Sequence, residues 1–246
     1  MPNPVFALPP YCVGPYTLRI TPTAREAFSD RRLIVEHDWN KGQARIARHL
    51  GTRRALECVF RSLVTAIHYR SGLNDRSNEE SYTHSLATGL VELAQNNPVF
   101  WRELNELLER EYVPGAQFAL ASDGVPPQGA RRPPSELVYD GHRCELNWVP
   151  DALWRDPNAY GFYWLKRNKI DINAGLQGNN LALVVLHEVL HFLHEKLGLR
   201  DNTKELLFKR TQAAALPRFI QQNPQFWCWW LGAVSRGCSQ SWALAA

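Results

Sequence analysis

The sequence lacks the features that mark exported, disulfide-bonded and membrane-spanning proteins. Its five cysteines are odd in number and include no CxxC pair, so they do not form a disulfide framework. The first residues carry no basic segment followed by a long apolar core, as a secretory signal would. Apolar stretches such as Leu181–Leu186 are far too short to cross a membrane. We therefore expect a soluble cytoplasmic protein with reduced thiols.

Charge of one sign is not concentrated anywhere in the chain. The formal net charge is only +4, and basic residues occur as scattered pairs such as Arg53-Arg54 and Arg131-Arg132. Nucleic acid is therefore not an expected partner. We expect a peptide or protein substrate, or a protein partner, and no membrane.

What the sequence does contain is an internal repeat. Displaced by 126 positions, residues 59–101 align with 185–227 without a gap, and thirteen of the 43 pairs are identical. Unrelated sequences match at roughly one position in fifteen, so the alignment predicts a duplication. The predicted domains are residues 1–113 and 135–246, joined over 114–134 by a linker rich in proline and glycine.

Both copies predict the same order of elements, most clearly in the second. Four strands are expected there, at Leu137–Tyr139, Cys144–Trp148, Gly161–Trp164 and Ile170–Asn173. Asp140-Gly141 predicts a hairpin turn between the first two. A helix over about 180–197 ends at Gly198, and further helices follow it. We predict an α+β fold of two modules, each a small antiparallel sheet followed by packed helices.

The predicted helix carries His187-Glu188-Val189-Leu190-His191, an HExxH motif. Residues four apart project from one helix face, so His187 and His191 point to one place. Zinc takes imidazole nitrogens at about 2.0–2.1 Å and keeps one position open for water in catalytic sites. Glu188 can then act as general base without binding the metal. Since this helix is apolar almost all round, a metal would satisfy its polar groups, and two satisfied structural histidines are the alternative.

A family resemblance extends this motif. Tyr160-Gly161-Phe162-Tyr163-Trp164, Lys169-Ile170-Asp171-Ile172-Asn173 and Leu186-His187-Glu188-Val189-Leu190-His191 together resemble the small zincin-like HExxH proteins of phages and mobile elements. The resemblance covers roughly residues 137–227, and residues 11–101 resemble a decayed relative. It implies that the strand Ile170, Asp171, Ile172 and Asn173 lines the cleft and pairs with an extended substrate. It also implies a third ligand on the next helix, a glutamate in the gluzincin branch, since Leu197 excludes the metzincin histidine.

Glu205 is the best third ligand by position, in the first turn of the next helix, and capping of that helix is the alternative. The first copy reads Arg61, Ser62 and Thr65 at the HExxH positions and cannot hold zinc. Residues that both copies share are better explained by the fold. His194 aligns with His68, so we interpret both as structural or as hydrogen-bonding neighbours of the ligands.

Five other polar residues near the motif have plainer explanations. Tyr160 and Tyr163 could stabilise an oxyanion, but aromatic residues at such positions usually belong to the core. His142 is expected in a solvated loop. Glu195 lies too far along the helix from His187 to share a metal, and Asp201 is expected to cap a helix.

The sequence thus predicts a zinc-dependent hydrolase, most simply a peptidase, with one zinc ion per chain and an inactive first copy. His187, His191 and Glu205 would bind the metal, and Glu188 would be the catalytic base. The alternative is a non-catalytic, metal-stabilised structural or assembly protein of phage or prophage type.

Overall fold

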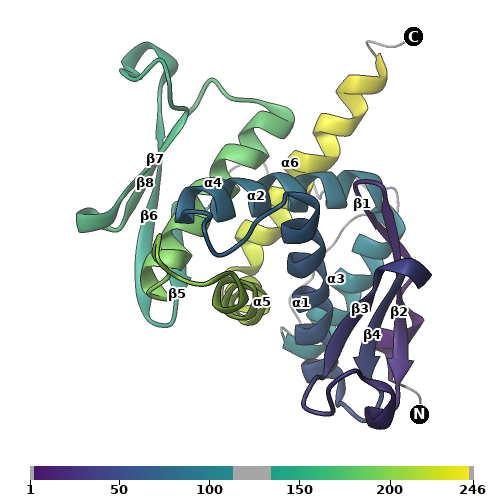
Figure 1. The fold of residues 1–246 in the computed structure, drawn as a ribbon. Helices are drawn as coiled ribbons and strands as arrows, with labels where there is room; N and C mark the ends of the chain where they lie inside the picture. The colour runs from purple at the N-terminus through teal and green to yellow at the C-terminus, as the bar shows by residue number, and fades with distance from the viewer. Residues whose placement is uncertain (1–2, 113–133, 244–246) are drawn as a thin grey trace.

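The computed structural model describes residues 3–112 and 134–243, called here the first and second halves. Apart from Pro134, the predicted linker 114–134 lies outside these residues. The strands are β1 Tyr11–Val13, β2 Tyr16–Thr23, β3 Val35–Asp38, β4 Gln43–Ala47, β5 Glu136–Tyr139, β6 His142–Val149, β7 Gly161–Trp164 and β8 Lys169–Asn173. The α-helices are α1 Thr52–Arg70, α2 Glu79–Asn96, α3 Pro98–Tyr112, α4 Gly178–Lys196, α5 Glu205–Gln222 and α6 Pro224–Ala243. The fold is α+β, with the helices between two sheets at opposite ends (Figure 1).

Both sheets are mixed, which corrects the prediction of antiparallel sheets. Their strand orders are β1-β2-β4-β3 and β5-β6-β8-β7. The predicted hairpins are present, but the central pairs β2–β4 and β6–β8 are parallel. The β7–β8 hairpin folds back so that β8, not β7, lies beside β6. Hairpin signals in a sequence are local, whereas this central pairing joins strands that are not neighbours in the chain.

The two halves have matching elements. Strands β6, β7 and β8 and helices α4, α5 and α6 each begin 126 residues after β2, β3, β4, α1, α2 and α3, respectively. The registers match too: Leu18 pairs with Tyr11 and Cys144 pairs with Leu137. Asn97 and Asn223 make the same contacts, because each side-chain amide binds the backbone of the first strand of its half, at Cys12 and Val138.

One apolar core runs through both halves, because each second helix crosses to the other half. Helix α2 packs against α4, and α5 packs against α1. Equivalent aromatic residues meet where the halves join: Tyr82 stacks on Phe208 with ring centroids 3.9 Å apart, and Trp101 lies 5.7 Å from Trp227. The helices around this junction are therefore related by an approximate two-fold arrangement. None of the described helices is long and apolar enough to span a membrane.

The halves also cap each other's helices. The Glu79 N–H at the start of α2 donates to Asp201 Oδ1 at 3.0 Å, and the Glu205 N–H at the start of α5 donates to Asp75 Oδ1 at 2.8 Å. Carboxylates are favoured at helix N-termini, where backbone N–H groups lack partners. Asp201 is thus a cap, as predicted, but of a helix in the first half.

Candidate metal centre

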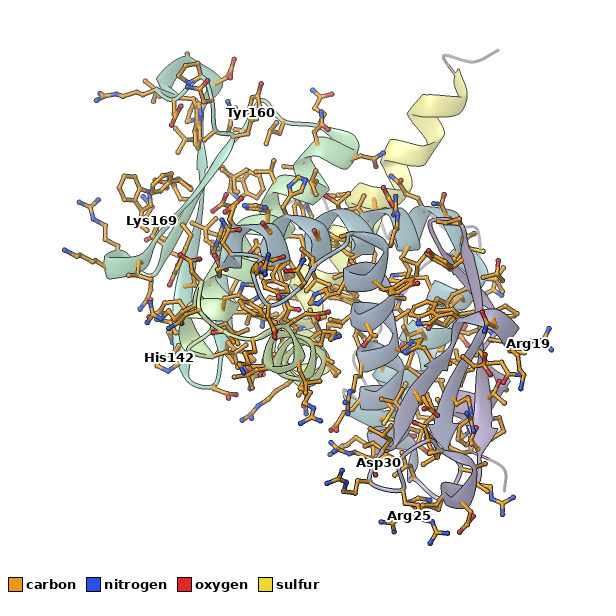
Figure 2. All side chains as sticks on the ribbon, in the orientation of Figure 1. Arg19, Arg25, Asp30, His142, Tyr160 and Lys169 are labelled. Carbon is orange, nitrogen blue, oxygen red and sulfur yellow. The ribbon has the colours of Figure 1, made fainter. Side chains whose placement is uncertain are left out.

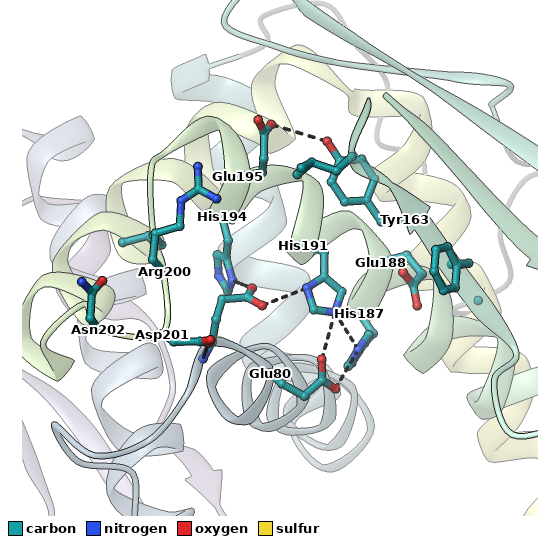
Figure 3. A pocket seen from close by; sticks show the side chains of 15 residues that line it. Glu80, Tyr163, His187, Glu188, His191, His194, Glu195, Arg200, Asp201 and Asn202 are labelled. Atoms are coloured by element: carbon teal, nitrogen blue, oxygen red, sulfur yellow. Dashed lines mark hydrogen bonds and ion pairs between the residues drawn. The ribbon is translucent and has the colours of Figure 1, made fainter. Parts of the chain in front are cut away.

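Helix α4 brings the two histidines of the HExxH motif together. It extends to Lys196, and Gly198, with a φ of 68°, closes its end through the bond from Leu199 N–H to the His194 carbonyl. His187 and His191 lie one turn apart on one face, and their Nε2 atoms are 3.0 Å apart. Both line a cleft of about 650 Å³ (Figure 3).

A third group reaches these histidines from α2, in the first half. The two carboxylate oxygens of Glu80 lie 3.3 Å from His187 Nε2 and 3.2 Å from His191 Nε2. Four-coordinate zinc, with ligand bonds of about 2.0–2.1 Å, spaces its ligand atoms about 3.3 Å apart. Glu80, His187 and His191 therefore form a candidate metal-binding group whose spacing fits such an ion.

Glu205, the expected third ligand, does not lie in this group. Its carboxylate pairs with Lys209 at 2.8 Å. Among the described residues, Glu205 is not one of those that line the cleft, and it does not belong to the candidate group. The reason is the crossing of the helices: α5 covers α1, and α2 covers α4. The carboxylate of the candidate group comes instead from Glu80 on α2, the helix of the first half that is equivalent to α5. Glu80 follows by one residue the position equivalent to Glu205.

Glu79 contacts the Nδ1 side of the His191 ring, opposite the Nε2 atom that faces Glu80. Its Oε2 lies 3.1 Å from His191 Nδ1, so the carboxylate accepts the Nδ1 proton and leaves the Nε2 lone pair for a metal ion. Burial by itself raises the pKa of Glu79, but hydrogen bonds from His191 and His194 outweigh it and hold the pKa well below its usual range. Burial likewise lowers the pKa of His191, and Glu79 reverses that shift, so the net change is upward. Burial lowers the pKa of His187 to about 4, which keeps its ring neutral.

Glu188 lies beside the ligands in a tightly packed position. Its side chain is buried, and a Cβ added to Gly161 on β7 would stand 2.7 Å from Glu188 Cγ. The Tyr163 backbone N–H donates to its carboxylate. Burial raises the pKa of Glu188 to about 7, against the opposing charge of His191. A carboxylate that exchanges its proton near neutral pH is suited to proton transfer with water.

The strand exposed at the cleft is β7, which corrects the expectation for Ile170–Asn173. Those residues lie in β8, whose two edges are hydrogen-bonded to β6 and β7. Gly161 and Tyr163 of β7 line the cleft. The Tyr160 carbonyl accepts from Asn173 N–H, so by alternation the backbone groups of Gly161 and Tyr163 point away from β8. The sequence predicted the hairpin but could not show which of its strands is the edge.

The remaining predicted residues lie in varied places. Tyr160 is 54% exposed, so it is not a core residue, and Tyr163 lines the cleft with its hydroxyl 3.5 Å from Glu195 Oε2. His142 is exposed where β6 begins. Figure 2 shows His142 and Tyr160 on the C-terminal sheet, at the margin of the molecule. His194 is buried behind the ligands, with its Nδ1 against Glu79.

The equivalent site, formed by α1 of the first half and α5 of the second, has lost every ligand type. Arg61 and Thr65 stand in place of the two histidines, and Leu206 stands in place of Glu80. Ser62, which replaces Glu188, is buried and contacts Tyr11 and His37.

One sequence signal could have pointed to Glu80 as a member of the candidate group. The half without the HExxH motif keeps a glutamate where the half with the motif has leucine. This complementary pattern is expected when one site takes its ligands from both halves.

Comparison with protein-family models, with curated proteins and with solved structures finds no match to this chain.

Proposed function

We propose that the protein is a zinc-dependent hydrolase that acts on peptide bonds, with His187, His191 and Glu80 as the metal ligands. The observation that carries this proposal is a cluster drawn from two helices of different halves: two imidazole Nε2 atoms 3.0 Å apart, each 3.2 to 3.3 Å from one of the two oxygens of the Glu80 carboxylate. Two imidazoles and one carboxylate are a ligand set of catalytic zinc sites, which keep a fourth position open.

The bound ion would polarise a substrate carbonyl and make water more acidic. Glu188 accepts the proton of the attacking water on its carboxylate and passes it on to the leaving amine. Glu79 keeps the Nδ1 proton of His191 in place, so that Nε2 remains a ligand. Packing of Gly161 against Glu188 fixes the position of the base.

The proposed substrate is an extended peptide that pairs with the exposed edge of β7. The outward backbone groups of Gly161 and the outward carbonyl of Tyr163 supply hydrogen bonds for such a strand, and the same residues line the cleft beside Glu188. Phe162 and Leu165 also line the cleft, and both are largely exposed apolar residues. They offer contacts for the apolar side chains of a substrate.

We also propose that the two halves arose from one duplicated zincin-like unit. The constant offset of 126 residues between equivalent elements and the thirteen identities support this. In this view the first half is not an idle copy. It contributes Glu79 and Glu80 to a site whose histidines and base belong to the second half.

The second candidate function is a non-catalytic, metal-stabilised assembly module, and His84 favours it. His84 follows Glu80 by one turn of α2, is exposed, and has its ring 6.2 Å from that of His187. Rotation of this side chain could supply a fourth protein ligand, and zinc sites with four protein ligands are structural.

One experiment separates the two functions. Purified protein is loaded with one equivalent of zinc and incubated with a peptide library, beside Glu188→Gln loaded in the same way. Cleavage by wild type alone supports the hydrolase. A folded, zinc-loaded wild type that cleaves nothing contradicts it and favours the structural module. A Co²⁺ spectrum that changes on His84→Ala would then show that His84 is a ligand.

A further inference from the structure

A chain of buried polar groups continues from the candidate metal centre into the interior. His194 is 1% exposed and Gln212 is 2% exposed. The His194 Nδ1 contacts Glu79 Oε1, and the His194 Nε2 lies 2.9 Å from the Gln212 side-chain nitrogen. The Thr83 hydroxyl donates to Glu79 Oε1 at 2.8 Å. Polar groups this deeply buried are costly unless each finds a partner.

The donors and acceptors of this chain can be arranged in only one way when Glu79 is ionised. The carboxylate only accepts, so His191 and His194 both donate to it from Nδ1. A neutral His194 must then accept at Nε2, and the Gln212 amide nitrogen is the donor there. The order is therefore Gln212 to His194 to Glu79, with Glu79 accepting from His191 on its other side. In a neutral His191 ring this order places the proton on Nδ1 and leaves Nε2 as the acceptor.

The groups of the chain come from three helices and both halves. Glu79 and Thr83 lie on α2, His194 on α4 and Gln212 on α5. His194 and Gln212 stand behind Glu79, and neither belongs to the candidate metal-binding group. Any effect that they have on a metal ion must pass through Glu79 and His191.

The equivalent site, formed by α1 and α5, provides an internal comparison. His68 and Glu205 occupy the positions equivalent to His194 and Glu79, and His68 is also fully buried. There, however, Leu86 replaces Gln212 and Lys209 replaces Thr83, and Lys209 pairs with Glu205. The Lys209 ammonium thus stands beside Glu205 where the Thr83 hydroxyl donates to Glu79. The Gln212 side chain also reaches His68, so Gln212 lies between the two histidines, with its nitrogen against His194.

We propose that His194 and Gln212 are positioning residues of the metal centre, which fix the Glu79 carboxylate and through it the ligand orientation of His191. This inference rests on the proposed function only in assuming that the centre binds zinc. Mutation of such outer hydrogen-bonding partners typically weakens metal affinity about 10- to 100-fold.

The test measures the zinc Kd of full-length variants by competition with a chromophoric chelator. Gln212→Leu places the residue found at the equivalent position 86 and removes the donor to His194 Nε2. His194→Leu removes the donor to Glu79, whereas His194→Asn can keep a donor near the position of Nδ1. His68→Leu is the control for the loss of an equally buried histidine at the equivalent helix position, because it removes the other contact of Gln212 and leaves both Gln212 and His194 in place. Thermal midpoints without metal report the structural cost of each change.

We expect Gln212→Leu and His194→Leu to weaken zinc binding about 10-fold or more, with His194→Asn closer to wild type and His68→Leu within about threefold. If His194→Leu does not fold, His194→Asn and Gln212→Leu decide the question. The inference is overturned if Gln212→Leu and the folded His194 variants bind zinc as tightly as wild type while His191→Ala loses it. Failure of wild type itself to bind zinc would overturn the proposed function, and this inference with it.

Discussion

The carboxylate of Glu80 lies 3.3 Å from Nε2 of His187, although the two residues belong to different halves of the molecule. This contact exists because α2 crosses over to cover α4. A metal ion bound there would join the halves, so metal binding and association of the halves should be thermodynamically coupled.

Replacement of Glu80 should therefore affect zinc binding far more than replacement of Glu205. Glu80→Gln removes the only carboxylate in the candidate group, and we expect a loss of zinc affinity greater than about 100-fold, beyond that of an outer partner. Glu205→Gln should leave the Kd within about threefold. Isothermal titration with both variants gives the comparison, and equal losses in the two would argue against Glu80 as the ligand.

Glu188→Gln should retain zinc and lose activity. Glutamine matches glutamate in size but cannot take a proton, so the rate of peptide cleavage should fall at least about 10²-fold. Metal content, measured by mass spectrometry on the same preparation, should stay near one equivalent. Loss of zinc from this variant would instead mean that Glu188 is a ligand and that its assigned role is wrong.

Gly161→Ala should lower activity through the position of Glu188. The new Cβ would lie 2.7 Å from both Glu188 Cγ and Val184 Cγ1, so these side chains must move. Displacement of a catalytic group by about 1 Å can cost about 10²-fold in rate. Zinc affinity should change little, because the atoms nearest to the added Cβ belong to Glu188 and Val184, which are outside the candidate group. Gly51→Ala, at a position with open space around it and no positive φ, shows the effect of an added methyl elsewhere in the chain.

His68 should make the protein less stable in acid. Its burial lowers its pKa to about 3, so the unfolded chain, with an ordinary value near 6.5, takes up the proton first. The resulting stability is present above about pH 6.5 and is lost as the pH falls toward the folded pKa. The loss between pH 6.5 and 4 should be about 3 kcal/mol from this residue. Urea unfolding at several pH values should show that the free energy of unfolding falls less steeply toward acid pH in His68→Leu than in wild type. Identical slopes would refute the assignment.

Local features of the structure could be predicted from the sequence, and the contacts between distant segments could not. The bounds of α4, its end at Gly198 and the β5–β6 and β7–β8 hairpins follow from periodicity, glycine and turn residues. The parallel pairing of β6 with β8 depends on where a hairpin folds back, which no local pattern records. Likewise, an apolar helix face shows that a helix is covered but not which helix covers it. For that reason the motif residues His187, Glu188 and His191 were found, whereas Glu80 was not.

The approximate two-fold arrangement of the halves predicts that a second metal centre can be built between α1 and α5. Helix α5 packs on α1 as α2 packs on α4, so the combined changes Arg61→His, Thr65→His and Leu206→Glu place the three ligand types at equivalent positions. Lys209→Thr should accompany them, because the Lys209 ammonium now pairs with Glu205 beside that site. The fourfold variant should bind two zinc ions per chain by native mass spectrometry, the second more weakly, since Leu86 cannot supply the hydrogen bond that Gln212 donates to His194. The matched control carries Arg61→His, Thr65→His and Lys209→Thr but keeps Leu206. It should bind the second ion more weakly than the fourfold variant does. A folded fourfold variant that binds a single zinc ion would show that the two halves do not place these positions equivalently.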